Sequence, residues 1–365
     1  MPRSFRAGLA ALALATLFAC RAPADAPPAT APSSAPSSGA AQPAGSHGLP
    51  PGADVAAPVA KLRVPYSAIA GSTLLLPLAR DAGLFARNGL DVEVVSIPGS
   101  SVVLQSMLAG EIPISAVSSA AVVEADLAGA DIPIIAGVVN RAVNVLMVVP
   151  SVNAVADLKG KRLGVPRIGD STDFLTRYAL RQQGLEPDRD TAILQIGGNQ
   201  EIVTAMQNGA IEGGALSSPS TIRARRLGYH QVLDLGALGV PYQHTTVNVL
   251  GSYLKTHEDV VQRFLRAYIE AIWLFRADKE FTQKALADFA STDDQELLDE
   301  TWELYALHYL ERIPYPTLEG LQTVLNESLQ PKAKEAKPEQ FVDLRVLESL
   351  KASGFFDDLR ARYGD

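Results

Sequence analysis

The chain has 365 residues, which is enough for two folded lobes and too many for one small core. Apolar residues make up 47% and charged residues 20%, a balance typical of a folded globular protein. The formal net charge of −8 argues against a nucleic-acid partner, and the single cysteine, Cys20, excludes an internal disulfide and a cysteine-based metal cluster.

The first twenty residues have the layout of a secretion signal. Arg3 and Arg6 precede an apolar run over residues 7–19, which is too short to span a membrane and has the length of a signal-peptide apolar region. The run ends in LFAC, which resembles the bacterial lipobox, where the cysteine becomes the lipidated first residue of the mature protein. We therefore predict a lipoprotein signal peptide over 1–19 and lipidation of Cys20. The alternative is ordinary secretory cleavage beside an incidental cysteine.

Residues 20–60 consist almost entirely of Ala, Pro, Ser and Gly. Such a composition cannot bury enough apolar surface to fold. We predict a disordered tether between a lipid anchor and the folded body. A leftover propeptide is the alternative, and it predicts disorder as well.

From Lys61 onward, short β-rich runs alternate with segments of helical pattern. The predicted strands are residues 62–66, 91–97, 112–117, 134–139, 162–165, 192–196 and 211–216. The predicted helices are residues 73–87, 101–108, 120–128, 172–183 and 200–208, with Ser72, Ser100 and Ser171 as expected N-caps. A further helix is expected after the N-cap Ser218 and Pro219. Strands alternating with helices favour α/β lobes with parallel sheets.

The remaining sequence is mainly helical. Apolar residues recur at helical spacing between Val260 and Trp273, and we interpret this stripe as core. A last helix is predicted over residues 341–352.

One stretch of the sequence occurs twice. MLAGEIPISAVSS, residues 107–119, returns as MQNGAIEGGALSS, residues 206–218, at a constant offset of 99. An internal repeat fixes architecture, and this one predicts a helix–Gly–strand–Ser-Ser–helix unit used once in each of two similar lobes. Each of the two strands should then carry a pair of hydroxyls toward a common cleft.

Several stretches resemble one family. ARDAGLFARNGLDVEV (79–94), SMLAGEIPISAVSSA (106–120), DLKGKRLGVPRIGDST (157–172) and the repeat itself are similar to the nitrate/sulfonate/taurine-type substrate-binding proteins of ABC importers. That group is related to the thiamine-pyrimidine-precursor binding proteins. The resemblance covers about residues 62–274.

The resemblance implies a periplasmic-binding-protein type II-like fold, in which two α/β lobes close on a ligand. Lobe one would comprise residues 61–145 plus 245–365 and lobe two residues 146–244, with crossover segments near 143–149 and 244–250. It also implies a monomer on the periplasmic or cell-surface side of a bacterial membrane, held there by the lipid anchor. Its partners would be an ABC permease and ATPase.

The strand ends carry the candidate ligand-binding residues. Ligands of open α/β sheets bind beyond the carboxyl ends of strands, where helix starts offer free N–H groups and a partial positive charge that suit an anion. The candidates are Tyr66, Ser67, Ser100, Ser101, Ser118, Ser119, Arg167, Ser171, Thr172, Asn199, Ser217 and Ser218. Ser118, Ser217 and Thr172 are the strongest. The alternative is that these residues are only helix caps.

Two arginines follow predicted strand ends. A guanidinium at Arg141 or Arg167 would clamp a carboxylate or sulfonate with two hydrogen bonds. The alternative for each is an ordinary surface arginine.

The sequence offers no catalytic residue, no cofactor motif and no metal site. It lacks G-x-x-x-x-G-K-[ST], G-x-G-x-x-G, G-x-S-x-G and H-E-x-x-H, and its histidines show no metal-ligand spacing. We therefore predict a binding protein and not an enzyme. The resemblance implies a sulfonate, a carboxylate or a heteroaromatic compound as ligand. One alternative is a ligand-sensing lipoprotein for a membrane receptor. Another is a pyrimidine-synthase-like enzyme, although the chain lacks the cysteine-rich motif of those enzymes and offers only His244 as a residue of interest.

Overall fold

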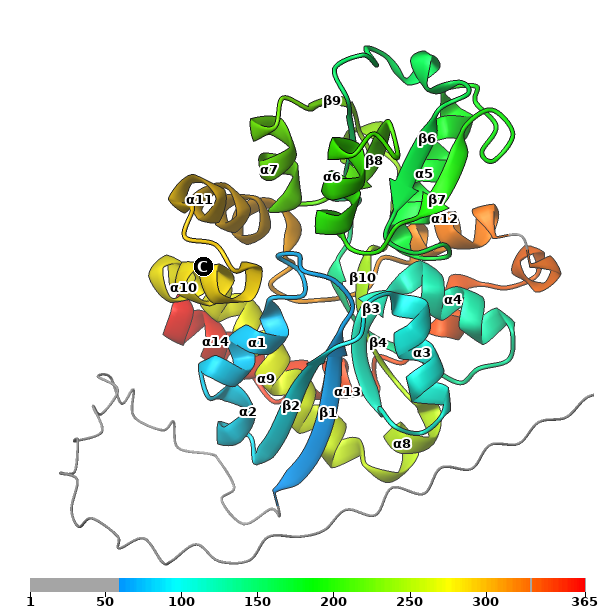
Figure 1. Ribbon diagram of the computed structural model, residues 1–365. Helices are drawn as coiled ribbons and strands as arrows, with labels where there is room; N and C mark the ends of the chain where they lie inside the picture. The colour runs from blue at the N-terminus through cyan, green and yellow to red at the C-terminus, as the bar shows by residue number, and fades with distance from the viewer. Residues whose placement is uncertain (1–58, 329, 365) are drawn as a thin grey trace, which may run out of the picture. The chain divides into compact units, whose positions relative to one another are not determined.

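The computed structural model describes residues 59–328 and 330–364 (Figure 1). They all belong to one compact unit, Pro51–Asp365. The predicted signal peptide, Cys20 and nearly all of the predicted tether lie outside the described residues, and their predictions are therefore not tested.

The described strands form three sheets. The first is a parallel pair, β1 (Ala60–Tyr66) and β2 (Leu90–Ser96). The second places β10 (Thr245–Val249) between β3 (Ile114–Ser118) and β4 (Ile134–Val139). The third has the order β7 (Ala192–Gln195), β6 (Arg162–Val165), β8 (Gly213–Leu216), β5 (Val145–Val148) and β9 (His230–Asp234).

The second sheet is antiparallel and the third is mixed, because β10 and β5 run against their neighbours. β10 is antiparallel to both β3 and β4, and β5 is antiparallel to both β8 and β9. The remaining pairs, β6 with β7 and β6 with β8, are parallel, as the alternation of strands and helices predicts.

The expected crossover segments fall on β5 and β10. Each is an interior strand of its sheet, with a hydrogen-bonded neighbour on both sides. The chain passes from the second sheet to the third between Val139 and Val145, and returns between Asp234 and Thr245. The passages therefore come a few residues earlier than predicted. The lobe boundaries drawn from the sequence stay a prediction.

Helices follow most of the strands. Those between the strands are α1 (Leu75–Asp81), α2 (Leu84–Arg87), α3 (Ser100–Leu108), α4 (Ser119–Leu127), α5 (Ser171–Gln182), α6 (Asn199–Gln207) and α7 (Ser220–Arg226). Figure 1 shows α5, α6 and α7 beside the strands of the third sheet, and α1, α2 and α3 beside β1, β2 and β3. The predicted helix 73–87 is in fact two helices, because Gly83 takes a φ of 68° between them.

The C-terminal part is helical, as predicted. It contains α8 (Gly251–Thr256), α9 (Glu258–Ala277), α10 (Lys279–Ala290), α11 (Gln295–Glu303), a π-helical segment (Leu304–Tyr309), α12 (Leu318–Glu327), α13 (Arg345–Ala352) and α14 (Phe355–Tyr363). α13 is shorter than the last helix predicted from the sequence, and α14 was not predicted.

Helix α9 forms the centre of the largest core cluster. The apolar stripe predicted on it is buried, and Phe264, Tyr268 and Ile272 are fully inaccessible to solvent. α9 packs against α1, α2, α13 and α14. The interpretation of this stripe as core is confirmed. Among the described residues, no helix combines the length and the apolar character that crossing a membrane requires.

The predicted N-caps are wrong. Ser100 and Ser171 are the first residues of α3 and α5 and not the caps before them, and α7 begins at Ser220. The N-cap residues of these helices are Gly99, Asp170 and Pro219, and none of them forms a side-chain capping bond. Ser72 does not cap α1 either, since the N-cap there is Leu74. The serine hydroxyls are thus available for contacts outside their own helices.

Candidate functional site

The repeated unit has the same local structure in both copies. In the first copy α3 is followed by Gly110, β3 and α4, and in the second copy α6 is followed by Gly209, β8 and α7. Both glycines take a left-handed conformation, with φ of 80° and 66°, which glycine adopts without strain at the end of a helix. The predicted unit is confirmed, and it places Ser118 and Ser217 at equivalent strand ends.

The two strand ends meet at one cavity of about 70 Å³. Its lining combines residues of β3 and β10 in the second sheet, the loops that follow β1 and β6, the starts of α3, α5 and α6, and residues directly beside β5 and β8 of the third sheet. The predicted site residues that line it are Ser67, Ser100, Ser118, Ser171, Thr172, Asn199 and Ser217. The other polar residues of the lining, which were not predicted as site residues, are Ser72, Thr73, Asn144, Asp170, His244 and Thr245.

Hydrogen bonds join the parts of the cavity wall. The hydroxyls of Ser118 and Ser171 lie 2.6 Å apart, and Ser171 also donates to the carbonyl of His244 at 3.3 Å. The side-chain amide of Asn199 donates to the hydroxyl of Ser217 at 3.1 Å. Ser118 therefore contacts the start of α5, a helix of the third-sheet region, directly across the cavity.

Asp170 joins the same two regions through its carboxylate. Its Oδ2 accepts the backbone N–H of Ser100 at 3.0 Å, so the carboxylate lies at the N-terminus of α3. The residue is 8% exposed, and burial raises the pKa of Asp170 to about 6, against the smaller lowering effect of the Ser100 amide. The carboxylate is consequently ionised at neutral pH although it is buried.

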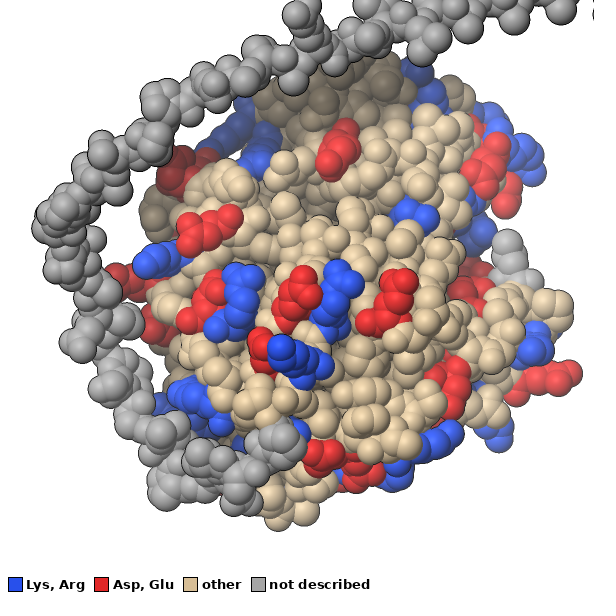
Figure 2. Space-filling model, turned by 60° about the horizontal axis from the view of Figure 1, so that its bottom comes forward, with Lys and Arg blue, Asp and Glu red and all other residues tan. Residues whose placement is uncertain are grey.

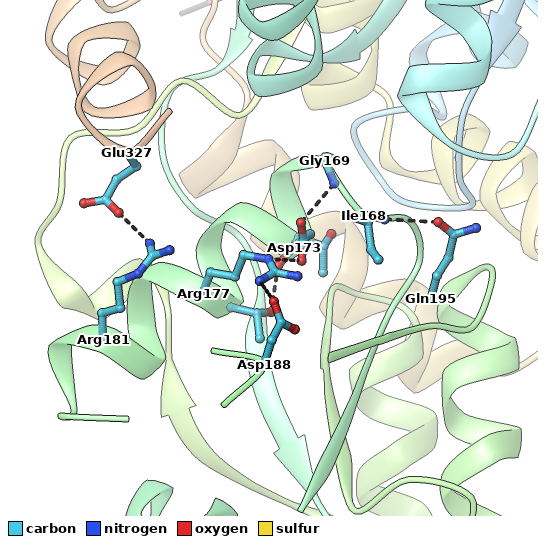
Figure 3. A network of polar contacts seen from close by, with 10 residues as sticks. Ile168, Gly169, Asp173, Arg177, Arg181, Asp188, Gln195 and Glu327 are labelled. Atoms are coloured by element: carbon cyan, nitrogen blue, oxygen red, sulfur yellow. Dashed lines mark hydrogen bonds and ion pairs between the residues drawn. The ribbon is translucent and has the colours of Figure 1, made fainter. Parts of the chain in front are cut away.

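The loop that carries Asp170 is fixed by a polar network (Figure 3). The N–H of Gly169 donates to Asp173 at 2.9 Å, and the N–H of Ile168 donates to Gln195 at 3.3 Å. Figure 3 also shows Arg177 bound to Asp173, at 2.7 Å, on the same helix α5. The loop is therefore held to α5 and β7 before it reaches the cavity.

A second contact in Figure 3 ties α5 to a C-terminal helix. Arg181 on α5 pairs with Glu327 on α12 at 2.8 Å. Arg177 also pairs with Asp188, which follows α5 in the chain, at 2.5 Å.

His244 presents a neutral imidazole. Its Nδ1 lies 2.9 Å from the hydroxyl of Thr245, and its Nε2 lies 3.1 Å from the side-chain oxygen of Asn144. Burial lowers the pKa of His244 to about 4, so the ring stays uncharged at neutral pH. Neither ring nitrogen bonds a serine of the cavity, which means that the serine–base pair of a nucleophilic enzyme is not formed here.

The other predicted site residues lie outside the lining. The ring of Tyr66 packs edge-on against Phe289, and Ser101 lies on α3, one position after the lining residue Ser100. The hydroxyl of Ser119 donates to the carbonyl of Gln243, and that of Ser218 pairs with Thr301 at 3.1 Å.

Neither Arg141 nor Arg167 is among the residues that line the cavity, and the proposed clamp stays a prediction. The stem of Arg167 covers Gly99 so closely that a Cβ added to this glycine would lie 2.3 Å from the Arg167 Cδ. Arg141 is exposed on the passage between β4 and β5. Among the described residues that line the cavity, Asp170 alone carries a charge at neutral pH.

Tyr305 was also missed by the sequence analysis. It lies in the π-helical segment, and its ring covers Gly71, where an added Cβ would lie 2.2 Å from the ring. The hydroxyls of Ser72 and Ser217 lie near enough to affect the pKa of Tyr305, although burial dominates and raises it. A tyrosine within a segment of helical pattern gives no sequence signal that it lies beside the cavity residues Ser72 and Ser217.

A larger groove, of about 880 Å³, lies elsewhere, between the start of β1 and α8. It contains none of the predicted site residues, and charged side chains such as Arg63 and Glu93 line it and pair with one another at 3.0 Å. The smaller cavity lies at the carboxyl ends of the strands, where α/β folds bind ligands, and it is therefore the candidate site.

The comparisons with known proteins agree with this geometry. The sequence model of the NMT1/THI5-like family matches residues 73–279. The protein with the printed name "Putative binding protein YtlA", from Bacillus subtilis (strain 168), is 25% identical over 279 residues, which are 73% of this chain and 83% of that protein.

Two solved structures have the same fold. The alkanesulfonate-binding protein SsuA from Xanthomonas axonopodis pv. citri, bound to MOPS, superposes with a TM-score of 0.68 at 20% identity, over 79% of this chain and 99% of SsuA. The periplasmic nitrate-binding protein NrtA from Synechocystis PCC 6803 gives a TM-score of 0.68 at 15% identity, over 82% of this chain and 91% of NrtA. The fold is thus that of the periplasmic binding proteins, as the sequence predicted.

Proposed function

Because the chain belongs to the NMT1/THI5-like family and has the periplasmic-binding-protein fold, we propose that it is an extracytoplasmic solute-binding protein. One observation carries the proposal. The two copies of the repeat bring Ser118 and Ser217 to one cavity, together with polar residues from four further strand–helix junctions. Hydroxyls, amides and a neutral imidazole can orient a small solute, and they supply no activated nucleophile.

We propose that binding is coupled to closure. Residues 61–145 plus 245–365 and residues 146–244 would form two lobes, and the passages at 140–144 and 235–244 would act as the hinge. The contacts of Ser118 with Ser171 and of Ser100 with Asp170 join the starts of α4 and α3 to the start of α5, so they would separate when the lobes open. A ligand that contacts both lobes would stabilise the closed state.

The relatives also support a proposed setting for this binding protein. Alkanesulfonate and nitrate are the ligands in the names of SsuA and NrtA, and a sulfonate, a carboxylate or a heteroaromatic compound are the ligand classes to test here. The lipobox-like end at Cys20 supports a lipid anchor on the outer side of the membrane. Delivery to an ABC permease and ATPase completes the proposed role.

The test is a thermal-shift screen of the soluble form, residues 59–365, against a library of small metabolites, followed by titration calorimetry of each hit. We expect at least one solute to raise the melting temperature and to bind with one-to-one stoichiometry. Mass spectrometry should then recover that solute unchanged after prolonged incubation. Chemical conversion of the solute, or a complete lack of hits, would contradict a solute-binding function.

A further inference from the structure

One oxygen of the Asp170 carboxylate has no partner. Oδ2 accepts the N–H of Ser100, whereas Oδ1 is shielded from solvent and accepts no hydrogen bond of normal geometry from the described residues. The N–H of Ser101 lies near enough to lower the pKa of the carboxyl but does not meet that geometry. A buried carboxylate oxygen without a donor is unfavourable, and native structures contain few such atoms. A group that donates a hydrogen bond to Oδ1 would therefore stabilise the arrangement seen here.

Three backbone N–H donors beside this cavity are already in use. Asp170 itself occupies the N–H of Ser100 at the start of α3. The N–H of Ser118 donates to the hydroxyl of Ser100 at 3.2 Å, and the N–H of Ser119 donates to the carbonyl of His244 at 3.1 Å. The chain thus supplies its own anion to the helix terminus at which an anionic ligand was expected.

We propose that Asp170 determines the specificity of the cleft, and that the ligand is a small solute with an N–H donor for Oδ1, either a cation such as an amidinium or ammonium group, or a neutral amide or amino-heteroaromatic. This inference rests on the proposed solute-binding function and selects among its ligand classes. A carboxylate or sulfonate enclosed beside the ionised Asp170 would be repelled, because charges interact strongly in a cavity with little water. No lysine or arginine lines the cavity to offset that repulsion.

The charge of Asp170 depends on pH within an accessible range. Burial raises its pKa to about 6, while the amides of Ser100 and Ser101 and the nearby Arg167 lower it and Asp173 raises it. Tyr242, which lies near Asp170, has a raised pKa from burial and stays neutral. Asp170 is therefore ionised at pH 7.5 and largely protonated at pH 5.

The experiment compares solutes of one shape and three charges. The probes are two triads, acetate, acetamide and acetamidine, and benzoate, benzamide and benzamidine, together with methanesulfonate. Calorimetry and thermal shift at pH 7.5 should give the amidine or the amide of a triad at least tenfold tighter binding than the carboxylate, and methanesulfonate should not bind. At pH 5 the preference for the amidine should fall by about tenfold, since protonated Asp170 has lost its charge.

Two variants isolate the carboxylate. Asp170→Asn keeps an N-cap and an acceptor for the Ser100 amide. The ratio of the affinities for the amidine and the carboxylate should fall tenfold or more in this variant. Asp188→Asn is the matched control, because it removes an equal charge from an exposed residue near α5. The backbone of Asp188 has a φ of 65°, which asparagine tolerates, so this control should bind like the wild type. If Asp170→Asn does not fold, the pH dependence of the wild type decides.

The outcomes separate this inference from the proposed function. Tighter binding of a carboxylate or of methanesulfonate by the wild type would overturn the role of Asp170 and leave solute binding intact. Equal preference in Asp170→Asn and in the wild type would overturn it as well. If no triad member binds, the hits of the metabolite screen decide. A hit that carries an N–H donor and no longer binds to Asp170→Asn supports the inference. Any other hit contradicts it. A screen without hits contradicts the proposed function itself.

Discussion

Ser118 and Ser217 allow the simplest test at the level of single residues. Both line the cavity, where the Ser118 hydroxyl pairs with that of Ser171 and the Ser217 hydroxyl accepts from Asn199. A ligand in the cavity would bind beside these contacts or replace them. A hydrogen bond to a charged ligand contributes about 1.5–3 kcal/mol, and about 1.4 kcal/mol is a tenfold change in affinity. Ser118→Ala and Ser217→Ala should each weaken binding about tenfold in calorimetry and leave the melting temperature nearly unchanged.

Ser119→Ala is the control for these variants. Its hydroxyl is buried against the carbonyl of Gln243 and lies outside the cavity lining. This variant should lower the melting temperature and keep the affinity. If Ser118→Ala and Ser217→Ala behave like Ser119→Ala, the two serines stabilise the fold and do not contact the ligand.

His244 predicts a dependence of stability on pH. Its pKa is lowered from 6.5 to about 4 by burial, so the unfolded chain binds the proton more readily than the folded protein. The stability contributed by the neutral ring is complete above pH 6.5 and falls as the pH drops toward 4. Between pH 7.5 and pH 5 this loss amounts to about 2 kcal/mol.

The measurement compares urea unfolding of the wild type and of His244→Gln at both pH values. The variant does not titrate at this position, so the difference between the two free energies of unfolding should shrink by about 2 kcal/mol at pH 5. The comparison is needed because Asp170 also titrates in this range. Its raised pKa makes the folded protein more stable as the pH falls, which opposes the effect of His244. A constant difference would show that His244 is not buried as described.

The sequence predicted the residue types of the site better than their local roles. Strand ends before helix starts pointed to Ser118, Ser171 and Ser217, because the carboxyl ends of strands are fixed by the fold class. Capping was assigned wrongly, since the helices begin at or after the serines expected as caps. The importance of Asp170 was missed because it depends on a carboxylate reaching Ser100, 70 residues away in the chain.

At the level of elements, local patterns predicted most strands within about two residues, and the apolar stripe of α9 was correct. The elements that the sequence missed depend on distant partners. β10 is a short run that becomes the centre of a sheet only through β3 and β4. The helix α14 was missed for the same reason, because its buried face requires α9 and α13.

The attachment of α14 to α9 gives a prediction about stability. The Glu270 carboxylate on α9 is 6% exposed and accepts from Arg87 at 2.9 Å, from Arg362 at 2.5 Å and from the hydroxyl of Tyr363 at 2.9 Å. Glu270→Gln leaves two arginines without their shared counter-charge. The free energy of unfolding in urea should fall by about 2–3 kcal/mol, while ligand affinity stays unchanged.

Glu93→Gln serves as the comparison for this variant. The Glu93–Arg63 pair joins side chains that are 63% and 54% exposed, and such pairs contribute about 0–1 kcal/mol. Equal destabilisation by Glu270→Gln and Glu93→Gln would mean that the Glu270 cluster does not anchor α14.

At the scale of the whole molecule, the net charge of −8 is accompanied by a mixed distribution of charge on the face drawn in Figure 2. On the face that Figure 2 turns forward, acidic and basic side chains of the described residues alternate, and no broad basic patch gathers there. Together with the net charge of −8, this distribution is compatible with the proposed binding of a small solute.

The location of the molecule is tested at Cys20. Lipidation would attach the chain to a membrane through an acyl anchor, and the Ala/Pro/Ser-rich residues 20–60 would let the folded body extend from it. Expressed with its own signal in a bacterial host, the wild type should appear in the membrane fraction and incorporate radiolabelled palmitate.

Cys20→Ser should be recovered in the soluble extracytoplasmic fraction without label. Its solute affinity should equal that of the wild type, because the anchor contributes nothing to the cavity. Ser46→Ala, within the same residues 20–60, should behave like the wild type. Identical fractionation and labelling of wild type and Cys20→Ser would contradict lipidation and leave ordinary secretion as the explanation of the signal.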